Sequence, residues 1–150
     1  MVIAAELLAE MVAHAREEFD AECCGMIAYE RSPDRAPRAV RVHRAHNVFA
    51  RSGDQPDRGA ARKRFEIDGR EVLRVMDEFE DAGWDLGAIY HSHTHTAPYP
   101  SQTDINFAAH WPGVEWAIVG LAAEEPEMRC YLIEEGEVRE VPIEIAEVEA

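Results

Sequence analysis

Residues 86–104 read LGAIYHSHTHTAPYPSQTD, an apolar run that passes directly into closely spaced histidines. The run from Leu86 to Tyr90 is short and apolar, which predicts a buried strand. Alternate residues of a strand point to the same side, so the side chains of His91 and His93 are expected to face one point. Two prolines then predict a loop, and Ser101 begins a short helix.

The same residues predict a metal site. Imidazole nitrogens and carboxylate oxygens are good ligands for zinc. The loop after His93 returns the chain so that Asp104 can supply a third ligand. Three protein ligands leave the fourth position of a tetrahedral ion open for water, which is typical of a catalytic site rather than a structural one.

Hydrolysis at such a site also needs a general base that is not itself a ligand. Glu22 stands immediately before the apolar segment 23–27, at the start of an expected buried strand. A carboxyl group in a partly apolar setting is suited to accepting and returning a proton. We therefore predict that Glu22 is the general base.

The rest of the chain predicts helices and strands interspersed around this stretch. Helices are expected over 4–19 and from the N-cap Asp68 to Gly83, with Glu71 completing a capping box and a buried stripe of Val72, Leu73, Met76 and Phe79. Strands are expected over 23–29, 39–49, 115–122 and 128–134, with a last strand through Val141, Ile143 and Ile145. A turn is expected over 31–38 and a mobile loop over 51–64. This order predicts an α/β (α+β) fold, a mixed β-sheet flanked by helices, with residues 1–150 as a single domain.

The composition of the chain limits the classes of binding partner and the cellular compartment that we expect. Thirty acidic residues against fifteen basic ones give a formal charge of −15, which disfavours binding to nucleic acid or to anionic membranes. The cysteines are Cys23, Cys24 and Cys130, a poor set for disulfides, and we interpret them as buried thiols. No secretory signal or membrane span is evident, so a reducing cytoplasm is the expected compartment.

The combination of Glu22, His91-Ser92-His93, Ser101 and Asp104 at this spacing resembles the JAMM (MPN+) metalloprotease family. The resemblance extends along nearly the whole chain, through Glu-Cys-Cys-Gly and Asn47. It implies a cytidine-deaminase-like JAMM fold, with zinc held by the two histidines and the aspartate. It also implies that Glu22 is the general base and that Ser101 stabilises the tetrahedral oxyanion.

The closest likeness is to the small prokaryotic branch that acts on ubiquitin-like sulfur-carrier proteins. Thr94 and the run Ala97-Pro98-Tyr99-Pro100-Ser101 are similar to members that release cysteine from the C-terminal glycine of a carrier. This implies a partner that is a small ubiquitin-like protein ending in Gly-Gly, and a step that completes cysteine biosynthesis. Two alternatives stay open: an isopeptidase that removes ubiquitin-like tags from lysines, and a non-catalytic MPN-type binding module.

Several residues allow two interpretations. Ser101 and Asp104 also fit a helix capping box, and capping is compatible with metal binding by Asp104. His95 continues the two-residue spacing, but we interpret it as a loop residue near the substrate. Tyr99, Trp111 and Trp116 fit either a peptide groove or the core.

Overall fold

The computed structural model describes residues 1–51 and 58–146, and within them eight strands form one sheet. The strands are β1 (Val2–Ile3), β2 (Cys24–Ser32), β3 (Arg35–Ala45), β4 (Asp85–His93), β5 (Glu115–Gly120), β6 (Glu127–Glu134), β7 (Glu137–Val141) and β8 (Glu144–Ile145). The helices are α1 (Ala5–Glu18), α2 (Val48–Arg51), α3 (Arg58–Ala61), α4 (Gly69–Asp81) and α5 (Gln102–Ala108). The predicted α+β class with a mixed sheet is confirmed.

The centre of the sheet is formed by β2, β4 and β5. The strand order is β7-β6-β5-β4-β2-β3-β1-β8. Strand β4 is antiparallel to β2, where Cys24 pairs with His91, and parallel to β5, where His91 pairs with Ile118. A parallel neighbour requires a crossover, and the chain makes it through α5. Strand β4, which ends with His91 and His93, is therefore hydrogen-bonded to a neighbouring strand on each side.

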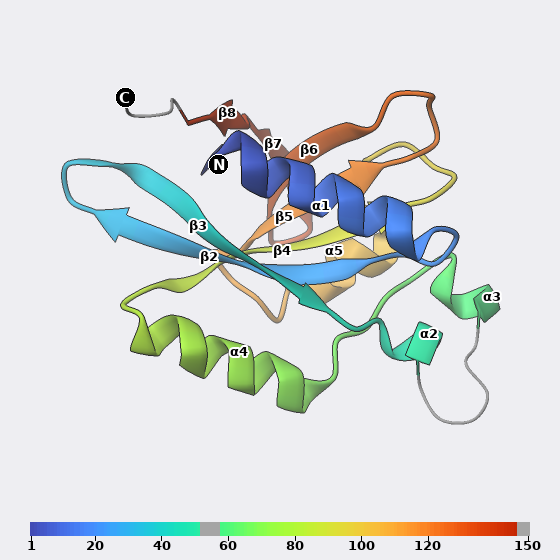
Figure 1. Cartoon of the computed structure of the whole chain (residues 1–150), viewed down its shortest axis with the longest axis horizontal. Coiled ribbons are helices and arrows are strands. Elements are labelled where there is room, and N and C mark those ends of the chain that lie inside the picture. The colour runs from blue at the N-terminus through green and yellow to red at the C-terminus, as the bar shows by residue number, and fades with distance from the viewer. Residues whose placement is uncertain (52–57, 147–150) are drawn as a thin grey trace.

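Helices cover both faces of the sheet, with α1 and α4 on opposite sides (Figure 1). On the α1 side, Met11 and Ala15 pack with Ala88 and Tyr90 of β4. On the other side, α4 packs through Val75 and Phe79, and Ala108 of α5 joins the cluster that contains Ile89 and Trp116. Side chains of β4 alternate between the two faces, so His91 and His93 share the face of Ile89.

Two predictions about the hairpin formed by β2 and β3 are corrected. The turn expected over 31–38 is confined to Pro33 and Asp34, and both strands extend to it. Pro37 lies inside β3, opposite a register irregularity between Glu30 and Ser32. A proline is tolerated at such a bulge because a ladder hydrogen bond is already missing there.

Helix α4 also departs from its prediction. Asp68 is the N-cap and accepts a hydrogen bond from the Arg70 N–H, but Glu71 does not complete a capping box. Its carboxylate instead contacts His43 Nε2 at 2.8 Å and accepts from the His46 N–H. The buried residues of α4 are Val75 and Phe79, whereas Leu73 is 67% exposed and Met76 36% exposed.

The remaining boundaries shift in smaller ways. The strand expected through 39–49 ends at Ala45, and α2 follows. The expected loop over 51–64 contains α3, while its residues 52–57 lie outside the described residues. The expected last strand is divided into β7 and β8, and the chain turns into β7 at Glu135 and Gly136, both with positive φ.

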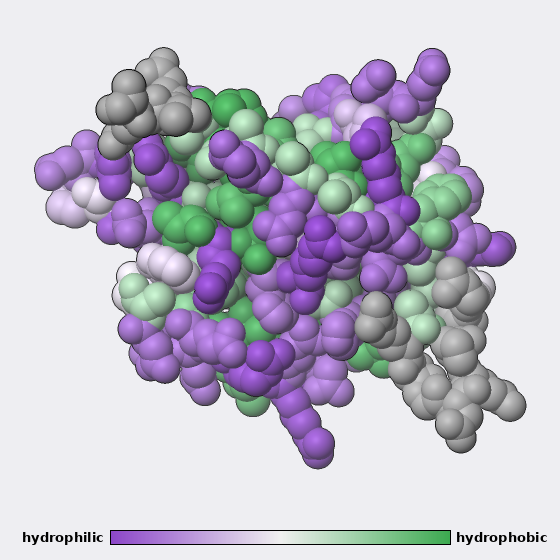
Figure 2. Space-filling view, viewed as in Figure 1, coloured by the Kyte–Doolittle hydropathy of each residue, from purple (hydrophilic) through white to green (hydrophobic). Residues whose placement is uncertain are grey.

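One face of the molecule is mainly hydrophilic (Figure 2). Figure 2 shows hydrophilic side chains over most of the face seen in Figure 1, with smaller hydrophobic areas between them. Among the helices of the described residues, none has the length and apolarity needed to cross a membrane.

Candidate metal centre and active site

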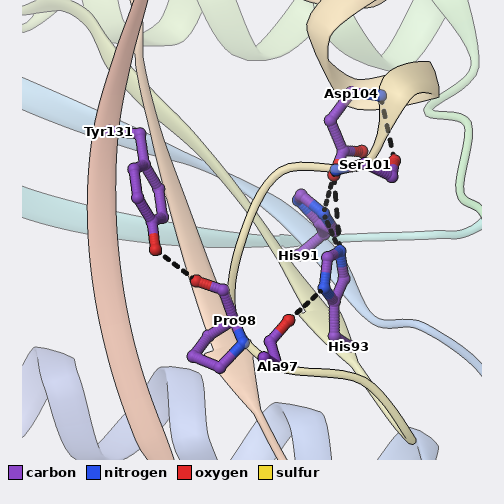
Figure 3. A network of polar contacts seen from close by, with 7 residues as sticks. All are labelled: His91, His93, Ala97, Pro98, Ser101, Asp104 and Tyr131. Atoms are coloured by element: carbon purple, nitrogen blue, oxygen red, sulfur yellow. Dashed lines mark hydrogen bonds and ion pairs between the residues drawn. The ribbon is translucent and has the colours of Figure 1, made fainter. Parts of the chain in front are cut away.

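Three buried side chains converge at the end of β4 and the start of α5. His91 Nε2 and His93 Nε2 lie 3.1 Å apart, and Asp104 Oδ2 lies 3.1 Å from the first and 3.3 Å from the second (Figure 3). The residues are 0%, 5% and 4% exposed, respectively. The structure thus brings together the three residues predicted as ligands, in an arrangement compatible with a metal ion.

Local hydrogen bonds orient two of these ligands. His93 Nδ1 lies 2.9 Å from the Ala97 carbonyl oxygen, which can only accept, so Nδ1–H donates to it and Nε2 is left to face the cluster. The loop that contains Ala97 is in turn fixed, because the Tyr131 hydroxyl donates to the Pro98 carbonyl at 2.5 Å (Figure 3).

Asp104 is oriented by the start of α5. The Ser101 N–H donates to Asp104 Oδ2 at 2.9 Å, and Ser101 Oγ accepts from the Asp104 N–H at 3.1 Å. This is the predicted capping box, and it holds the carboxylate that faces the two histidines. Capping and convergence with the histidines are therefore found together.

Aromatic side chains enclose His91. The Phe65 ring stacks on the imidazole with centroids 4.6 Å apart, and the Trp116 ring meets it edge-on at 6.5 Å. Within the described residues, His91 Nδ1 and Trp116 Nε1 are buried without a hydrogen-bond partner. No local pattern in the sequence predicts a role for Phe65, since a phenylalanine in a polar stretch carries no sign of the side chain on which it will stack.

The charges in the cluster complement one another. Burial by itself would raise the pKa of Asp104, but the charge of His91 and hydrogen bonds from His91, His93 and Ser101 hold it well below its usual range. Burial opposes protonation of His93, yet its hydrogen bonds to Asp104 and Ala97 raise its pKa. Asp104 is therefore an anion in the folded protein, as a metal ligand must be.

Glu22 lies just before β2 and is 5% exposed. Burial raises its pKa to about 8, the charge of His93 lowers it, and the charge of Asp104 raises it further. The residue that follows Glu22, Cys23, is hydrogen-bonded to Ser92, which stands between the two histidines in β4. A pKa near neutrality suits a group that takes up and returns a proton.

Ser101 is exposed at the N-cap of α5. A hydroxyl group has one proton to donate as well as lone pairs that accept. Since the contact with the Asp104 N–H uses a lone pair, the hydroxyl proton remains available for a negatively charged oxygen beside the cluster.

The other candidate residues lie in different settings. His95 is exposed and meets the Phe19 ring edge-on, and it is not part of the cluster. Tyr99 is 56% exposed and packs edge-on against Tyr131. Cys23 and Cys24 are buried free thiols, which agrees with their structural interpretation.

An apolar cavity of about 210 Å³ adjoins the cluster. Its walls come from residues 65–67, α4, β4, α5, the segment after α5, and β5. They include Phe65, Ile67, Val72, Ile89, Phe107, Trp111 and Trp116. Phe65 and Trp116 contact both this cavity and His91. Trp111 and Trp116 thus line this cavity and also pack in or against the core cluster that contains Ile89.

The sequence of this chain is similar to those of known proteins. The profile of the family described as prokaryotic homologs of the JAB domain matches residues 4–134. The chain is 34% identical over 152 residues to the CysO-cysteine peptidase of Mycobacterium tuberculosis, covering 98% of this chain and 92% of that protein. It is 32% identical over 120 residues to the desampylase of Haloferax volcanii, covering 77% of each.

Solved structures share the fold. A protein from Desulfitobacterium hafniense superimposes with a TM-score of 0.78 at 28% identity, covering 98% of this chain and 93% of that one. A JAB1/MPN domain protein from Archaeoglobus fulgidus gives a TM-score of 0.63 at 16% identity, covering 98% and 100%, respectively.

Proposed function

The chain belongs to the family of prokaryotic homologues of the JAB domain, and from this premise we propose that it is a zinc-dependent hydrolase. Its substrate is the bond after the C-terminal glycine of a ubiquitin-like sulfur-carrier protein, and its product is free cysteine. The family resemblance inferred from the motif is confirmed, and with it the assignment to an enzyme family.

The observation that carries the proposal is the triangle of His91 Nε2, His93 Nε2 and Asp104 Oδ2, with edges of 3.1, 3.1 and 3.3 Å. A tetrahedral ion with bonds of about 2.0–2.1 Å needs ligands spaced by roughly 3.3 Å. The three atoms match one face of such a tetrahedron. Two imidazoles and one carboxylate are a donor set that suits zinc, and they leave a fourth position open.

When bound there, zinc would polarise the scissile carbonyl and make water more acidic. Glu22 would accept the proton of the attacking water and pass it to the leaving amine. Its burial supports this role, because the raised pKa lets the carboxyl both take and return a proton. Ser101 would donate its hydroxyl proton to the oxyanion of the tetrahedral intermediate.

The burial of the three candidate ligands supports a substrate whose chain end is narrow. Because His91, His93 and Asp104 are almost fully enclosed, a chain end that reaches them must be narrow. A Gly-Gly terminus has no side chains and allows a close backbone approach. The apolar cavity beside Phe65 and Trp116 would receive side chains that precede the two glycines.

The names of two relatives support particular identities for the leaving group. The mycobacterial relative, which matches over nearly the whole chain, is named as a CysO-cysteine peptidase, and this supports cysteine as the group released. The archaeal relative named as a desampylase supports a second candidate, an isopeptidase that removes ubiquitin-like tags from lysines. Both use the same site, and they differ only in the amine that leaves. The complete ligand set argues against a purely non-catalytic binding module.

The test is an intact-mass assay with zinc-loaded protein. One substrate is a ubiquitin-like carrier that ends in Gly-Gly-Cys, and the other carries a lysine peptide joined to Gly-Gly through its side chain. Loss of one cysteine residue from the first substrate is expected, and Asp104→Ala serves as the control without a complete ligand set. Cleavage of the lysine conjugate alone would favour the second candidate, and no cleavage of either by fully loaded protein would refute the proposal.

A further inference from the structure

Asn47 is buried between three segments that surround the candidate site. It is 6% exposed and makes four hydrogen bonds to described residues. Its Nδ2 group donates to the carbonyls of Glu22 and Arg64 at 3.0 and 3.1 Å. Its Oδ1 accepts from the N–H groups of Phe49 and Glu66 at 3.1 and 3.3 Å. Every donor and acceptor position of the amide is therefore used.

The backbone of Glu22 is tied down on both sides. Its N–H donates to the Ala61 carbonyl at 2.6 Å, and its carbonyl accepts from Asn47. The next residue, Cys23, donates its N–H to Ser92 Oγ at 2.8 Å and accepts from the Ser92 N–H at 3.1 Å. Asn47 adds a side-chain contact that joins this segment to the chain preceding α4.

The same amide also fixes the residues on either side of Phe65, since it bonds to Arg64 and Glu66. The Phe65 ring stacks on the His91 imidazole. The side chain of Asn47 thus binds the main chain at Glu22, the candidate base. It also binds the main chain on both sides of Phe65, whose ring packs on the candidate ligand His91.

We propose that Asn47 is a positioning residue that fixes Glu22 relative to the His91–His93–Asp104 cluster. It does not touch the reacting atoms, and it acts through the main chain at position 22. This inference rests on the proposed function for its kinetic part only. The main-chain carbonyl and the side chain of Glu22 are attached to the same Cα, so a shift of this main chain also moves the carboxyl group that must meet a water molecule. A displacement of about 1 Å at such a group can cost ~10²-fold in rate.

Two substitutions test this role. Asn47→Ala removes all four hydrogen bonds. Asn47→Asp keeps the shape and the two hydrogen bonds that Oδ1 accepts, but it replaces the Nδ2 group with one oxygen atom, which would face the carbonyls of Glu22 and Arg64 and cannot donate to them. The matched control is Tyr29→Phe, which removes a hydrogen bond of 2.6 Å to Glu115 at the far end of β2.

The first readout needs no substrate. Amide hydrogen exchange is measured at Glu22 and Cys23, whose N–H groups are bonded to Ala61 and Ser92 rather than to Asn47. Faster exchange at both in the two Asn47 variants, and wild-type exchange in Tyr29→Phe, is the expected result. Unchanged exchange in the Asn47 variants would overturn the inference.

The second readout separates positioning from loss of the metal site. Cobalt-substituted protein is assayed on the Gly-Gly-Cys carrier, and its visible absorption reports the geometry of the three ligands. We expect wild-type absorption in both Asn47 variants, with kcat per bound metal reduced by about 10- to 100-fold and KM changed by no more than about twofold. A changed spectrum, or wild-type kcat per bound metal, would overturn the inference.

The two experiments fail in distinguishable ways. If the wild-type protein cleaves no carrier, the proposed function is wrong, and amide exchange still decides whether Asn47 holds the segment of Glu22. If the wild-type protein cleaves the carrier and Asn47→Ala does so equally well, the proposed function stands and the positioning role is wrong.

Discussion

Ser101 allows a structural and a chemical contribution to be separated by substitution. Its Oγ accepts from the Asp104 N–H at 3.1 Å, while its own N–H donates to Asp104 Oδ2 at 2.9 Å. The second bond belongs to the main chain, so Ser101→Ala leaves it in place. The carboxylate that faces His91 and His93 therefore keeps its orientation, and the expected metal content is that of the wild type.

Loss of the helix cap and loss of the oxyanion donor differ in size, and a different measurement reveals each. Removing a side-chain N-cap costs ~1 kcal/mol of folding stability, which lowers the Tm of a domain of this length by about 2–4 °C. Removing one donor to an oxyanion costs ~3 kcal/mol in the transition state, which corresponds to about 10²-fold in kcat. KM should change little, because the oxyanion is formed only during the reaction.

Three variants distinguish these effects in the intact-mass assay. Ser101→Ala should lose the cap and the donor. Ser101→Gly should lose only the donor, because glycine at an N-cap costs only a few tenths of a kcal/mol relative to serine. Ser101→Thr retains a hydroxyl group and should retain most of the activity. If Ser101→Ala and Ser101→Gly, fully loaded with metal, turn over the carrier at nearly the wild-type rate, the assignment of Ser101 to the oxyanion is refuted.

Further predictions concern the base, the metal and the thiols. Glu22→Gln should keep its metal, measured by mass spectrometry, and lose ~10²–10⁴-fold in kcat; undiminished turnover would rule out the base assignment. Chelation should abolish activity and lower the Tm, and zinc should restore both, with a stabilisation of ~4 kcal/mol when free metal exceeds its Kd about 1,000-fold; a Tm indifferent to metal would contradict the site. Burial raises the pKa of Cys23 and of Cys130 from 9.0 to about 12, so both thiols should resist iodoacetamide at pH 8 until the protein unfolds. The unfolded thiols ionise first, so their contribution to stability should be complete below pH 9 and lost as the pH rises toward 12; alkylation of the folded protein at the rate of a free thiol would contradict this.

The sequence predicted best where the determinants were local. The two-residue spacing of His91 and His93 requires only that β4 be a strand, and the offset between Ser101 and Asp104 is that of a capping box. Both features depend on a few neighbouring residues, so periodicity and capping rules were enough to anticipate them.

The sequence predicted poorly where distant residues compete. Glu71 was expected to cap α4, but His43, which lies 28 residues earlier in the chain, binds its carboxylate instead. Leu73 and Met76 fit the helical period and yet are exposed, because the sheet meets α4 through Val75 and Phe79. The contacts of Asn47 and Phe65 join segments whose proximity no local pattern encodes.

The two buried carboxyl groups of the site are driven toward different roles by the same fold. Asp104 stands at the start of α5, where main-chain and histidine donors stabilise its charge, and its pKa falls. Glu22 is enclosed, and its pKa rises to about 8 because burial outweighs the charge of His93. Two carboxyl groups whose pKa values are pushed apart can divide the work, one as a permanent anion and the other as a proton carrier. Exchanging the environments would remove this division. A base in the surroundings of Asp104 would not take up a proton, and a ligand in the surroundings of Glu22 would be largely protonated and uncharged near neutral pH. The donors at the start of α5 and on the two histidines therefore favour Asp104 as the anionic ligand, and the burial of Glu22 just before β2 favours it as the base.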